Sequence, residues 1–285
     1  MSLPRNHHYV SQCQIKNFFN QKEGKIYLYD KETNNFFHKT TTKTVFSETD
    51  ANSKFENGLI DHGSLEIDLK RNFEDDFTFC INEIHDAVVK NNQVFTQKLY
   101  QSLIILTKYG IIGEIRHPKF KAQSDQIIGN IFKEIASHAT PELKKQFKDL
   151  DNLMSQTKYS NNVIYSEFAD EVLSKMGEIF FHIYYIQDEG LFILPDRSSY
   201  SHRAKINEYF NPDVREIAIV DIPLSSKIFL HAKSKKMQDG SDKIILLTRQ
   251  NKDFIDKVNI SVLQIANKQV ACESGEYLKE LVKLL

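Results

Sequence analysis

The spacing of apolar residues changes along this chain, and that change limits what the chain can fold into. Between residues 64 and 176 apolar residues recur every three or four positions, which is typical of amphipathic helices. After Gly177 they form alternating β-branched and aromatic runs such as EIFFHIYYI, which predict strands. Two similar runs near the N-terminus, KIYLYD and FFHKTTTKTVF, flank a polar turn and predict a β-hairpin. Strands at both ends with helices between them predict an α+β protein.

The first helix of the middle segment is predicted from a single apolar stripe. The stripe contains Leu65, Leu69, Phe73, Phe77, Ile81, Ile84 and Val88. The next helix, Tyr100 to Ile115, is apolar almost all round, so we expect it to be the most buried, with Gly110 and Gly113 allowing close contact with another helix. Further helices are predicted over residues 121–139, 141–154 and 163–176.

The C-terminal part is predicted to be mostly strands. EIFFHIYYIQDEGLFILPD reads as two strands joined by a turn at 187–190, and EIAIVDIPL, KIFLHAKS and KIILLTRQ supply more. Helices are expected from about Lys252 to Cys272 and from Glu276 to Leu285. The predicted architecture is therefore a helix-rich middle of four to five helices and an antiparallel sheet. The N-terminal hairpin, Lys25 to Phe46, is expected to join that sheet because a lone hairpin is only marginally stable, and the helices are expected on one side.

The 285 residues contain no segment that reads as a linker, so we expect residues 1–285 to form a single compact domain. The formal net charge is -1, which gives no long-range field to attract nucleic acid. The N-terminus lacks the apolar stretch of a signal peptide, and nowhere do 18 apolar residues run together, so neither secretion nor a membrane span is predicted. Cys13, Cys80 and Cys272 lack the spacing of a disulfide framework or zinc site. We therefore expect buried thiols and a cytoplasmic protein.

Glu66 is the first candidate for a functional site. On a helical wheel it falls at the centre of the apolar stripe, so its carboxylate is expected to point inward and to need a hydrogen-bond partner, a cation or a metal. Lys70, one turn further, is the nearest candidate partner, and a simple Glu66–Lys70 pair at the helix rim is the alternative. Glu74 lies about 80° round the wheel and could reach the same site, or it is an ordinary solvated carboxylate.

Three other candidates lie far from Glu66 in the sequence. His7 and His8 carry imidazoles that can bind metal or move protons near neutral pH, or one caps backbone while the other faces solvent. Arg116 follows the most buried helix, where a guanidinium could hold a carboxylate or phosphate or form a structural salt bridge. Asp196 begins a polar loop directly after a predicted strand, where sites are often placed, although turn chemistry explains it equally well.

Several motifs that would identify an enzyme class are absent from the sequence. It contains no GxGxxG after a strand, no GxxxxGK[ST], no HExxH and no GxSxG. The sequence therefore gives no indication of a dinucleotide enzyme, a P-loop enzyme, a zincin or an α/β-hydrolase.

The order of several short blocks resembles a known bacterial family. HHYVSQCQIKNF, KIYLYDKETNNFF, LEIDLKRNFE, GEIRHPKF, LFILPDRSS, IPLSSKIFL and VNISVLQIANKQVA follow the block order of the family catalogued as domain of unknown function four-two-three-eight. The opening signature of that family is His-Tyr-Val-Pro-Gln followed by Leu-x-x-Phe. The resemblance covers nearly the whole chain and brings no established activity.

The resemblance implies that certain polar residues form one recurrent set. The family pattern falls on His8, Tyr9, Gln12, Glu66, Glu74, Arg116, Asp196 and Asn259. This chain departs from the pattern at Ser11, where the family usually has proline, and at Arg197-Ser198, where it more often has Asn-Pro. The first departure is expected to loosen the N-terminal turn, and the second distinguishes the loop after Asp196 from that of the family.

Two functional hypotheses follow. In the first, the protein is an enzyme in which His8, Glu66 and either Glu74 or Asp196 surround a divalent metal such as Mn or Mg. Arg116 holds an anionic substrate, most naturally a phosphoester that is hydrolysed, and the candidate catalytic residues are Glu66, His8, Arg116 and Asp196. In the second, it is a non-catalytic module with a buried structural polar network and a protein partner bound by surface loops. A solvent-reachable cleft favours the first and a closed interior the second.

Overall fold

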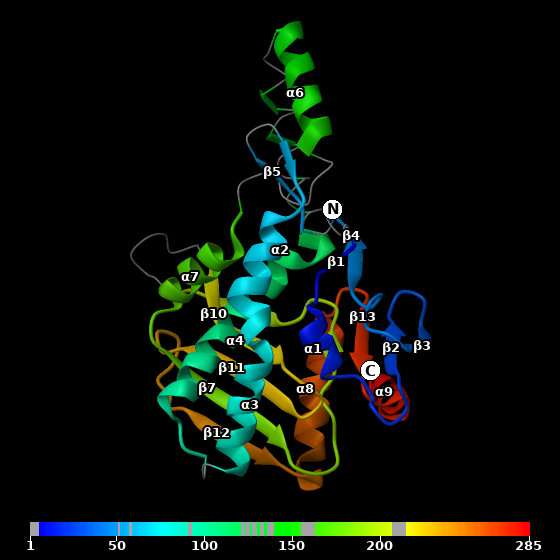
Figure 1. Ribbon diagram of the computed structural model, residues 1–285, viewed down its shortest axis with the longest axis vertical. Coiled ribbons are helices and arrows are strands. Elements are labelled where there is room, and N and C mark those ends of the chain that lie inside the picture. The colour runs from blue at the N-terminus through cyan, green and yellow to red at the C-terminus, as the bar shows by residue number, and fades with distance from the viewer. Residues whose placement is uncertain are drawn as a thin grey trace.

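The computed structural model describes residues 6–50, 52–56, 59–90, 93–120, 140–154, 163–206 and 215–285, with single positions between 121 and 139 (Figure 1). The helices are α1 Gln12–Lys16, α2 Ser64–Leu69, α3 Asp75–Val89, α4 Gln97–Arg116, α6 Pro141–Met154, α7 Tyr165–Met176, α8 Lys252–Ile265 and α9 Gly275–Val282. A π-turn, Lys70–Glu74, joins α2 to α3, and a 3-10 turn, Arg249–Asn251, precedes α8. The α+β prediction is thereby confirmed. The helix predicted over 121–139 lies largely outside the described residues.

The strands form two larger sheets and two short pairs. Their bounds are β1 Asn6–His8, β2 Ile26–Asp30, β3 Asn35–Lys39, β4 Ser47–Thr49, β5 Lys54–Glu56, β6 Leu59–Asp61, β7 Ile179–Ile186, β8 Leu194–Pro195, β9 Tyr200–Ala204, β10 Glu216–Pro223, β11 Ile228–Ser234, β12 Lys243–Leu247 and β13 Gln269–Cys272. The larger sheet has the order β12-β7-β11-β10-β9, and the smaller one has the order β3-β2-β13-β8. β1 pairs with β4, and β5 pairs with β6.

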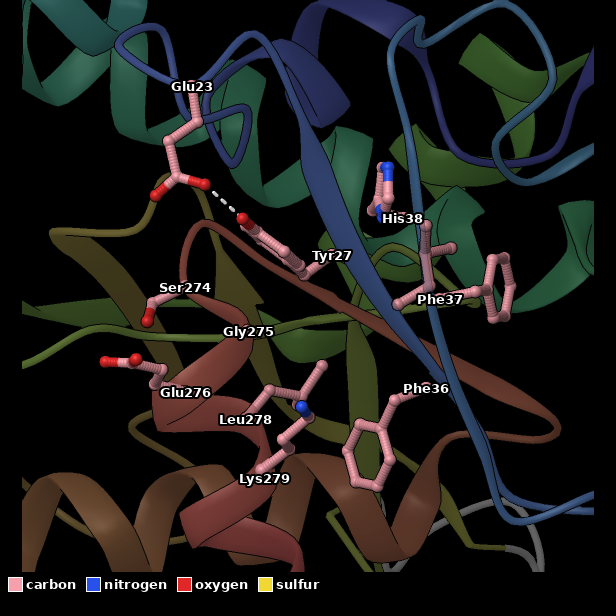
Figure 2. Close-up of a pocket in the computed structure, with 11 residues that line it drawn as sticks. Glu23, Tyr27, Phe36, Phe37, His38, Ser274, Gly275, Glu276, Leu278 and Lys279 are labelled. Atoms are coloured by element: carbon pink, nitrogen blue, oxygen red, sulfur yellow. Dashed lines mark hydrogen bonds between the residues drawn. The ribbon is translucent and has the colours of Figure 1, made fainter.

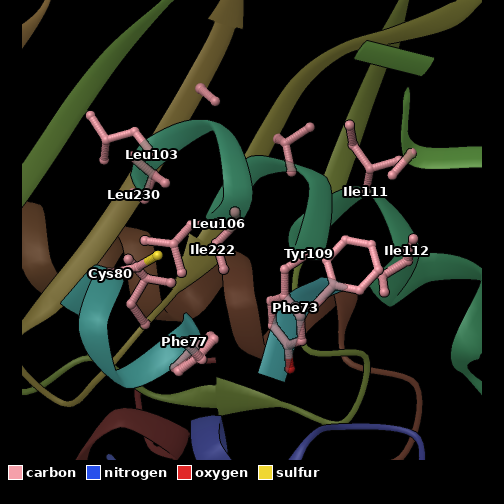
Figure 3. Close-up of a cluster of buried hydrophobic side chains, with 14 of the residues drawn as sticks. Phe73, Phe77, Cys80, Leu103, Leu106, Tyr109, Ile111, Ile112, Ile222 and Leu230 are labelled. Atoms are coloured by element: carbon pink, nitrogen blue, oxygen red, sulfur yellow. The ribbon is translucent and has the colours of Figure 1, made fainter. Parts of the chain in front are cut away.

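The larger sheet packs its apolar face against α3, α4 and α7. Figure 3 shows Phe77 and Cys80 close to Leu106 of α4 and to Ile222 and Leu230 of the sheet, all of them in one buried cluster. Because side chains alternate along a strand, these contacts fix which face of β7, β10 and β11 points toward the helices. The other face is covered in part by α8, where the ring centres of Phe254 and Tyr184 lie 5.1 Å apart. The prediction that all helices lie on one side was therefore wrong.

Gly110 and Gly113 do allow a close approach, as predicted, but the neighbour is not another helix. A Cβ at Gly110 would meet the side chain of Ile222 at 2.5 Å, and one at Gly113 would meet Ser199 Oγ at 2.5 Å. The absence of a side chain thus lets α4 lie directly on β10 and on the loop after Asp196.

The π-turn explains the buried face of the helix between Ser64 and Val89. The π-turn has about 4.4 residues, whereas each regular turn has about 3.6. With one such wide turn, the positions that point inward fall at roughly 65, 69, 73, 77, 80, 84 and 87. The residues at those positions, from Leu65 to Ala87, are all buried. Ile81 and Val88, which the straight-helix stripe placed inside, are only half-buried. The prediction was wrong at these two positions because it assumed a regular helix, and the π-turn changes which residues face inward after residue 74.

The N-terminal hairpin pairs with a strand at the other end of the chain. Tyr29 of β2 is opposite Val270 of β13, and Ala271 of β13 is opposite Leu194 of β8. The segment Lys252 to Cys272 was predicted as one helix, but the helix ends at Ile265 and β13 follows. The hairpin does join later strands, yet in a sheet separate from the five-stranded one.

Two further strand predictions need correction. The run after Gly190 does not return along β7, since only Leu194–Pro195 forms a strand, and it pairs with β13. The five-stranded sheet is also not wholly antiparallel, because β12 runs parallel to β7. A parallel pair needs a long connection between its two strands, and β12 follows β7 in the chain only after β8, β9, β10 and β11.

Candidate functional site

Arg116, the last residue of α4, is fully buried at the centre of a polar cluster. Its two terminal nitrogens donate to Ser11 Oγ at 3.1 Å and to the His8 backbone carbonyl at 2.7 Å. Burial alone would lower the pKa of Arg116, but nearby Tyr109, Tyr165, Glu74 and Glu66 outweigh burial and raise it. The guanidinium is therefore a fixed positive charge that ties the N-terminal segment to α4.

His8 lies half-buried beside this charge. Its Nε2 is 3.3 Å from the Thr42 carbonyl oxygen, which can only accept, so Nε2 carries the proton and Nδ1 is left as an acceptor. Burial and the Arg116 charge lower the pKa of His8, against the opposite effects of the Thr42 hydrogen bond, Glu66 and Glu74. The imidazole is therefore neutral at pH 7.

Glu66 and Glu74 face the same centre because of the π-turn. They are eight residues apart, and one turn of about 3.6 residues plus one of about 4.4 makes two full turns, which removes the 80° offset of a straight wheel. Both carboxylates are half-buried and act electrostatically on His8 and Arg116. Glu66 accepts a hydrogen bond from Asn52 Nδ2, so within the described residues its partner is Asn52 rather than the expected Lys70.

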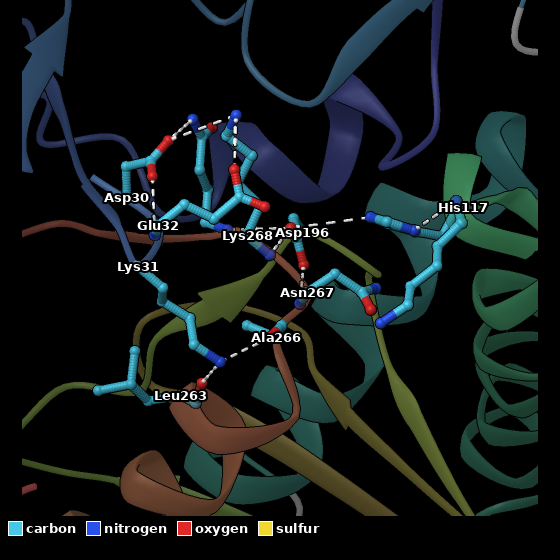
Figure 4. Close-up of polar contacts among 11 residues, drawn as sticks. Asp30, Lys31, Glu32, His117, Asp196, Leu263, Ala266, Asn267 and Lys268 are labelled. Carbon is cyan, nitrogen blue, oxygen red and sulfur yellow. Dashed lines mark hydrogen bonds and ion pairs between the residues drawn. The ribbon is translucent and has the colours of Figure 1, made fainter. Parts of the chain in front are cut away.

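Asp196 belongs to a different cluster (Figure 4). Its carboxylate accepts backbone N–H bonds from Asn267, Lys268 and Gln269 at 2.7–2.9 Å, and its Oδ2 lies 3.7 Å from His117 Nε2. These contacts hold the turn between α8 and β13. The structure brings four of the candidate residues together, namely His8, Glu66, Glu74 and Arg116. Asp196 instead stabilises the turn between α8 and β13.

The remaining residues of the family pattern also have packing roles. The Asn259 side chain is buried, accepting from the Ile193 N–H and donating to the Leu191 carbonyl and to Tyr277 Oη. Gln12 accepts from Thr42 Oγ1 at 3.2 Å. The ring centre of Tyr9 lies 5.3 Å from that of His117. His7, a sequence candidate outside the family pattern, is also buried, and its Nδ1 accepts the Asn52 N–H.

Sequence reasoning missed Gln14, which is the hub of the polar cluster. Its Nε2 donates to the carbonyls of Ser198 and Pro223, and its Oε1 accepts from Tyr109 Oη and Ser198 Oγ, all at 2.7–2.9 Å. One signal could have revealed it: Gln14 stands four residues from both Val10 and Phe18, which are fully buried. A polar residue in such an apolar row needs internal partners.

Asn52 and Tyr165 were also missed, because they come from distant segments. The Tyr165 hydroxyl donates to Asn52 Oδ1 at 2.6 Å, while Asn52 Nδ2 holds Glu66. No local pattern around either residue indicates this chain of contacts.

Cys13 borders the cluster but is not a reactive thiol. Burial raises the pKa of its thiol to about 12, and the neighbouring Glu74 acts in the same direction. The thiolate that nucleophilic chemistry needs is therefore scarce near pH 7. Cys80 and Cys272 are buried, and all three cysteines are free, as the sequence predicted.

Three further observations concern ligands. Among the described residues, no group of three His, Cys, Asp or Glu side chains is placed to hold a metal ion. A groove of about 390 Å³ between the β2–β3 hairpin and α9 has Tyr27 and Phe36 on its walls and Glu23, Glu276 and Lys279 at its rim (Figure 2). It contains none of the candidate site residues. Within the part of the chain that the structure covers, no helix is long and apolar enough to cross a bilayer.

Most residues of the family pattern therefore lie in the cluster around Arg116, in the turn held by Asp196 or in the contacts of Asn259. A family profile described as "Protein of unknown function (DUF4238)" matches residues 6–276. The chain belongs to the DUF4238 family. It matches no curated protein and no solved structure. Membership in DUF4238 therefore confirms the resemblance and leaves the activity to be inferred from the site.

Proposed function

We propose that this DUF4238 protein is a metal-dependent hydrolase of phosphoesters whose centre is formed by His8, Glu66, Glu74 and Arg116. The observation that carries the proposal is the π-turn, which aligns two half-exposed carboxylates over a buried arginine. Wide turns of this kind are rare and often occur at functional sites. A fully buried guanidinium is costly to bury, which also points to a site under functional constraint.

The pair of carboxylates is suited to Mg²⁺ or Mn²⁺. Such ions keep several waters and are commonly held by one or two carboxylates together with substrate phosphate, rather than by a complete protein cage. A site with two carboxylates and no third protein ligand is consistent with this mode of binding. The metal would supply charge neutralisation at the phosphoryl oxygens and a more acidic bound water.

The protein residues would have distinct roles in hydrolysis. His8 Nδ1 would accept a proton as water forms a bond to phosphorus and the bond from phosphorus to the ester oxygen breaks. Arg116 would act as a fixed positive charge behind the carboxylates and not as a clamp on the substrate, because its terminal nitrogens already donate to Ser11 and His8. Asn52 would orient Glu66.

A second candidate function is a non-catalytic binding module. The favouring observation is that Arg116, Gln14 and Asn52 are each hydrogen-bonded within the protein, as expected of a network that fixes the fold. In that case His8 and Glu66 would help to hold the fold instead of being held by it. Stability and activity of conservative variants therefore separate the two functions.

The test measures melting temperature with and without Mn²⁺ and hydrolysis of bis(p-nitrophenyl) phosphate. The variants are His8→Gln, Glu66→Gln and Glu74→Gln, with Asp75→Asn as the control because Asp75 is an exposed carboxylate on the same helix. For an enzyme, Mn²⁺ at about 100 times its Kd should stabilise the parent by about 2.7 kcal/mol. The two glutamate variants should lose this gain, all three site variants should hydrolyse at least about 100-fold more slowly, and Asp75→Asn should behave like the parent.

The opposite pattern would favour the binding module. Metal-independent melting of the parent, lowered melting of all three site variants and no hydrolysis would together rule out the proposed enzyme.

A further inference from the structure

A pocket of about 360 Å³ lies between α4, α7 and the β9–β10 edge of the larger sheet. α7 packs against both α4 and β10, next to which it is drawn in Figure 1. The apolar side chains that line the pocket are Ile111, Ile115, Phe120, Phe168, Val172 and Ile217. The three isoleucines are buried members of the main core, so this pocket, named here the α4–α7 pocket, gives access to core surface.

Charged side chains complete the lining of the α4–α7 pocket. Three cations, Lys175, Arg203 and Arg215, are exposed. Two carboxylates, those of Glu114 and Glu216, are half-buried. The lining therefore combines apolar walls with an excess of positive charge that lies in contact with water.

The two arginines are available to a ligand. Arg203 Nη2 lies 3.5 Å from Glu114 Oε2, and Arg197 Nη2 lies 3.5 Å from Oε1 of the same carboxylate. An exposed ion pair of this length contributes little to stability, so Arg203 can turn toward another carboxylate at small cost. Within the part of the chain that the structure describes, Arg215 forms no hydrogen bond or ion pair.

These features match one class of ligand. Sites for small molecules are typically apolar clefts with a few polar groups that fix the orientation of the ligand. Guanidinium groups bind carboxylates through two parallel hydrogen bonds, which favours an anionic head group on an apolar body. A methylene group takes up about as much space as a water molecule, about 30 Å³, so the pocket has room for roughly a dozen such groups. One alkyl chain fits this volume, whereas a lipid with two long chains does not.

We propose that the α4–α7 pocket binds an unbranched aliphatic carboxylate of about eight to ten carbons. The alkyl chain packs between α4, α7 and β10, and the carboxylate accepts hydrogen bonds from Arg203 and Arg215. The pocket contains none of the residues of the proposed hydrolase centre. Binding of the carboxylate is therefore a property separate from hydrolysis.

Calorimetric titration of the full-length parent protein with hexanoate, octanoate and decanoate tests burial of the alkyl chain. Each compound is used below the concentration at which it forms micelles. We expect Kd to fall about fourfold for each CH₂ added, because burial of a methylene contributes about 0.8 kcal/mol. An affinity that does not depend on the length of the alkyl chain would overturn the proposal.

The head group is tested with 1-octanol and with two arginine variants. 1-Octanol should bind at least about 10-fold more weakly than octanoate, because it lacks the charge that the guanidinium groups recognise. Arg203→Gln and Arg215→Gln should each weaken octanoate binding at least about threefold and leave 1-octanol binding unchanged. Arg249→Gln is the control, since Arg249 is exposed and follows β12 at the opposite edge of the sheet. Equal affinities for octanoate and 1-octanol, or unchanged octanoate binding in both variants, would contradict the proposed head-group site.

Filling the pocket tests where the alkyl chain lies. Val172→Trp should abolish binding of both octanoate and 1-octanol, because the indole takes the space of the alkyl chain. Ser174→Trp, an exposed position on the same helix, should bind both like the parent. Melting temperatures show whether each variant is folded, and the series of carboxylates with the parent does not depend on any variant. Glu66→Gln should keep the octanoate affinity of the parent, which separates this site from the proposed hydrolase. Unchanged octanoate binding in a folded Val172→Trp variant would place the ligand elsewhere and overturn the proposal.

Discussion

At the scale of single residues, the buried charges of Arg116 and Asp196 are held by fixed donors or acceptors. Arg116 donates to Ser11 and His8, and Asp196 accepts three backbone N–H groups. Such bonds offset the cost of removing a charge from water, and removing one partner leaves the other unsatisfied. Buried charges are therefore sensitive points even where they take no part in chemistry.

Asp196 gives a test of this principle. Burial raises its pKa, but the bonds from His117, Gln269 and Asn267 outweigh burial and lower it. A lowered pKa in the folded state adds stability that is complete above the unfolded-state pKa of about 3.9 and is lost as pH falls through the folded-state pKa. Asp196→Asn should therefore cost about 1.5–3 kcal/mol at pH 7 and lose less stability than the parent on acidification.

Urea unfolding at pH 7 and at pH 3 measures both effects. Asp188→Asn is the matched control, since Asp188 is exposed in a loop. Equal stability of parent and Asp196→Asn at pH 7 would contradict the expected role of the carboxylate.

At the scale of elements, the π-turn Lys70–Glu74 does two things at once. It keeps Leu65 and Leu69 on the same buried face as Phe73 and Phe77, and it brings Glu66 into line with Glu74. A regular helix of the same length could keep only one half of this face buried, since its turns of about 3.6 residues do not match an apolar spacing of four.

Deleting Arg71, an exposed residue of the π-turn, should convert the wide turn into a regular one. The two halves of the helix would then be rotated relative to each other by about 100°, and at least one large apolar side chain would leave the core at a cost on the order of 2–5 kcal/mol. Thermal unfolding checks this expectation. Arg71→Ala keeps the chain length and should melt like the parent, and a deletion variant as stable as that control would contradict the role of the turn.

At the scale of the whole molecule, the smaller sheet joins the two ends of the chain. β13 lies between the N-terminal strand β2 and the short strand β8, so its backbone bonds to both neighbours. The Asp196 carboxylate, one residue after β8, holds the turn that leads into β13. The hairpin, the end of α8 and the Asp196 loop are therefore expected to lose structure together.

Ala271→Pro tests this coupling, because proline in a central strand removes a ladder hydrogen bond and clashes with its neighbour. Hydrogen–deuterium exchange should increase in residues 26–30 and at Leu194 more than in α3 and α4, whose core is separate. Ala271→Val, which keeps the N–H, is the control. Unchanged protection of residues 26–30 in the proline variant would show that the ends of the chain are not coupled in this way.

The sequence by itself determined the features that depend on local spacing. The period change at Gly177, the apolar α4 and the hairpin turn each depend on neighbouring residues, and the α+β class follows from their order. The inward direction of Glu66 could also be predicted, because its position in the apolar stripe follows from neighbouring residues alone. The spacing of four residues between Leu65, Leu69, Phe73 and Phe77 is also wider than the turn of about 3.6 residues in a regular helix, which is consistent with the π-turn. A helical wheel that assumes a regular helix does not reveal this difference.

Only the tertiary structure decided which distant segments meet. A strand as short as Gln269–Cys272 carries too little periodicity to be separated from the helix before it, and its partner is about 240 residues away. Asp196 does not lie in the same cluster as Glu66, because three backbone N–H groups at residues 267–269 satisfy the charge of its carboxylate. Asn52 and Gln14 belong to the polar cluster around Arg116 through hydrogen bonds with residues that are distant in the sequence. Long-range pairing of this kind depends on which surfaces can be buried together, and local sequence does not encode it.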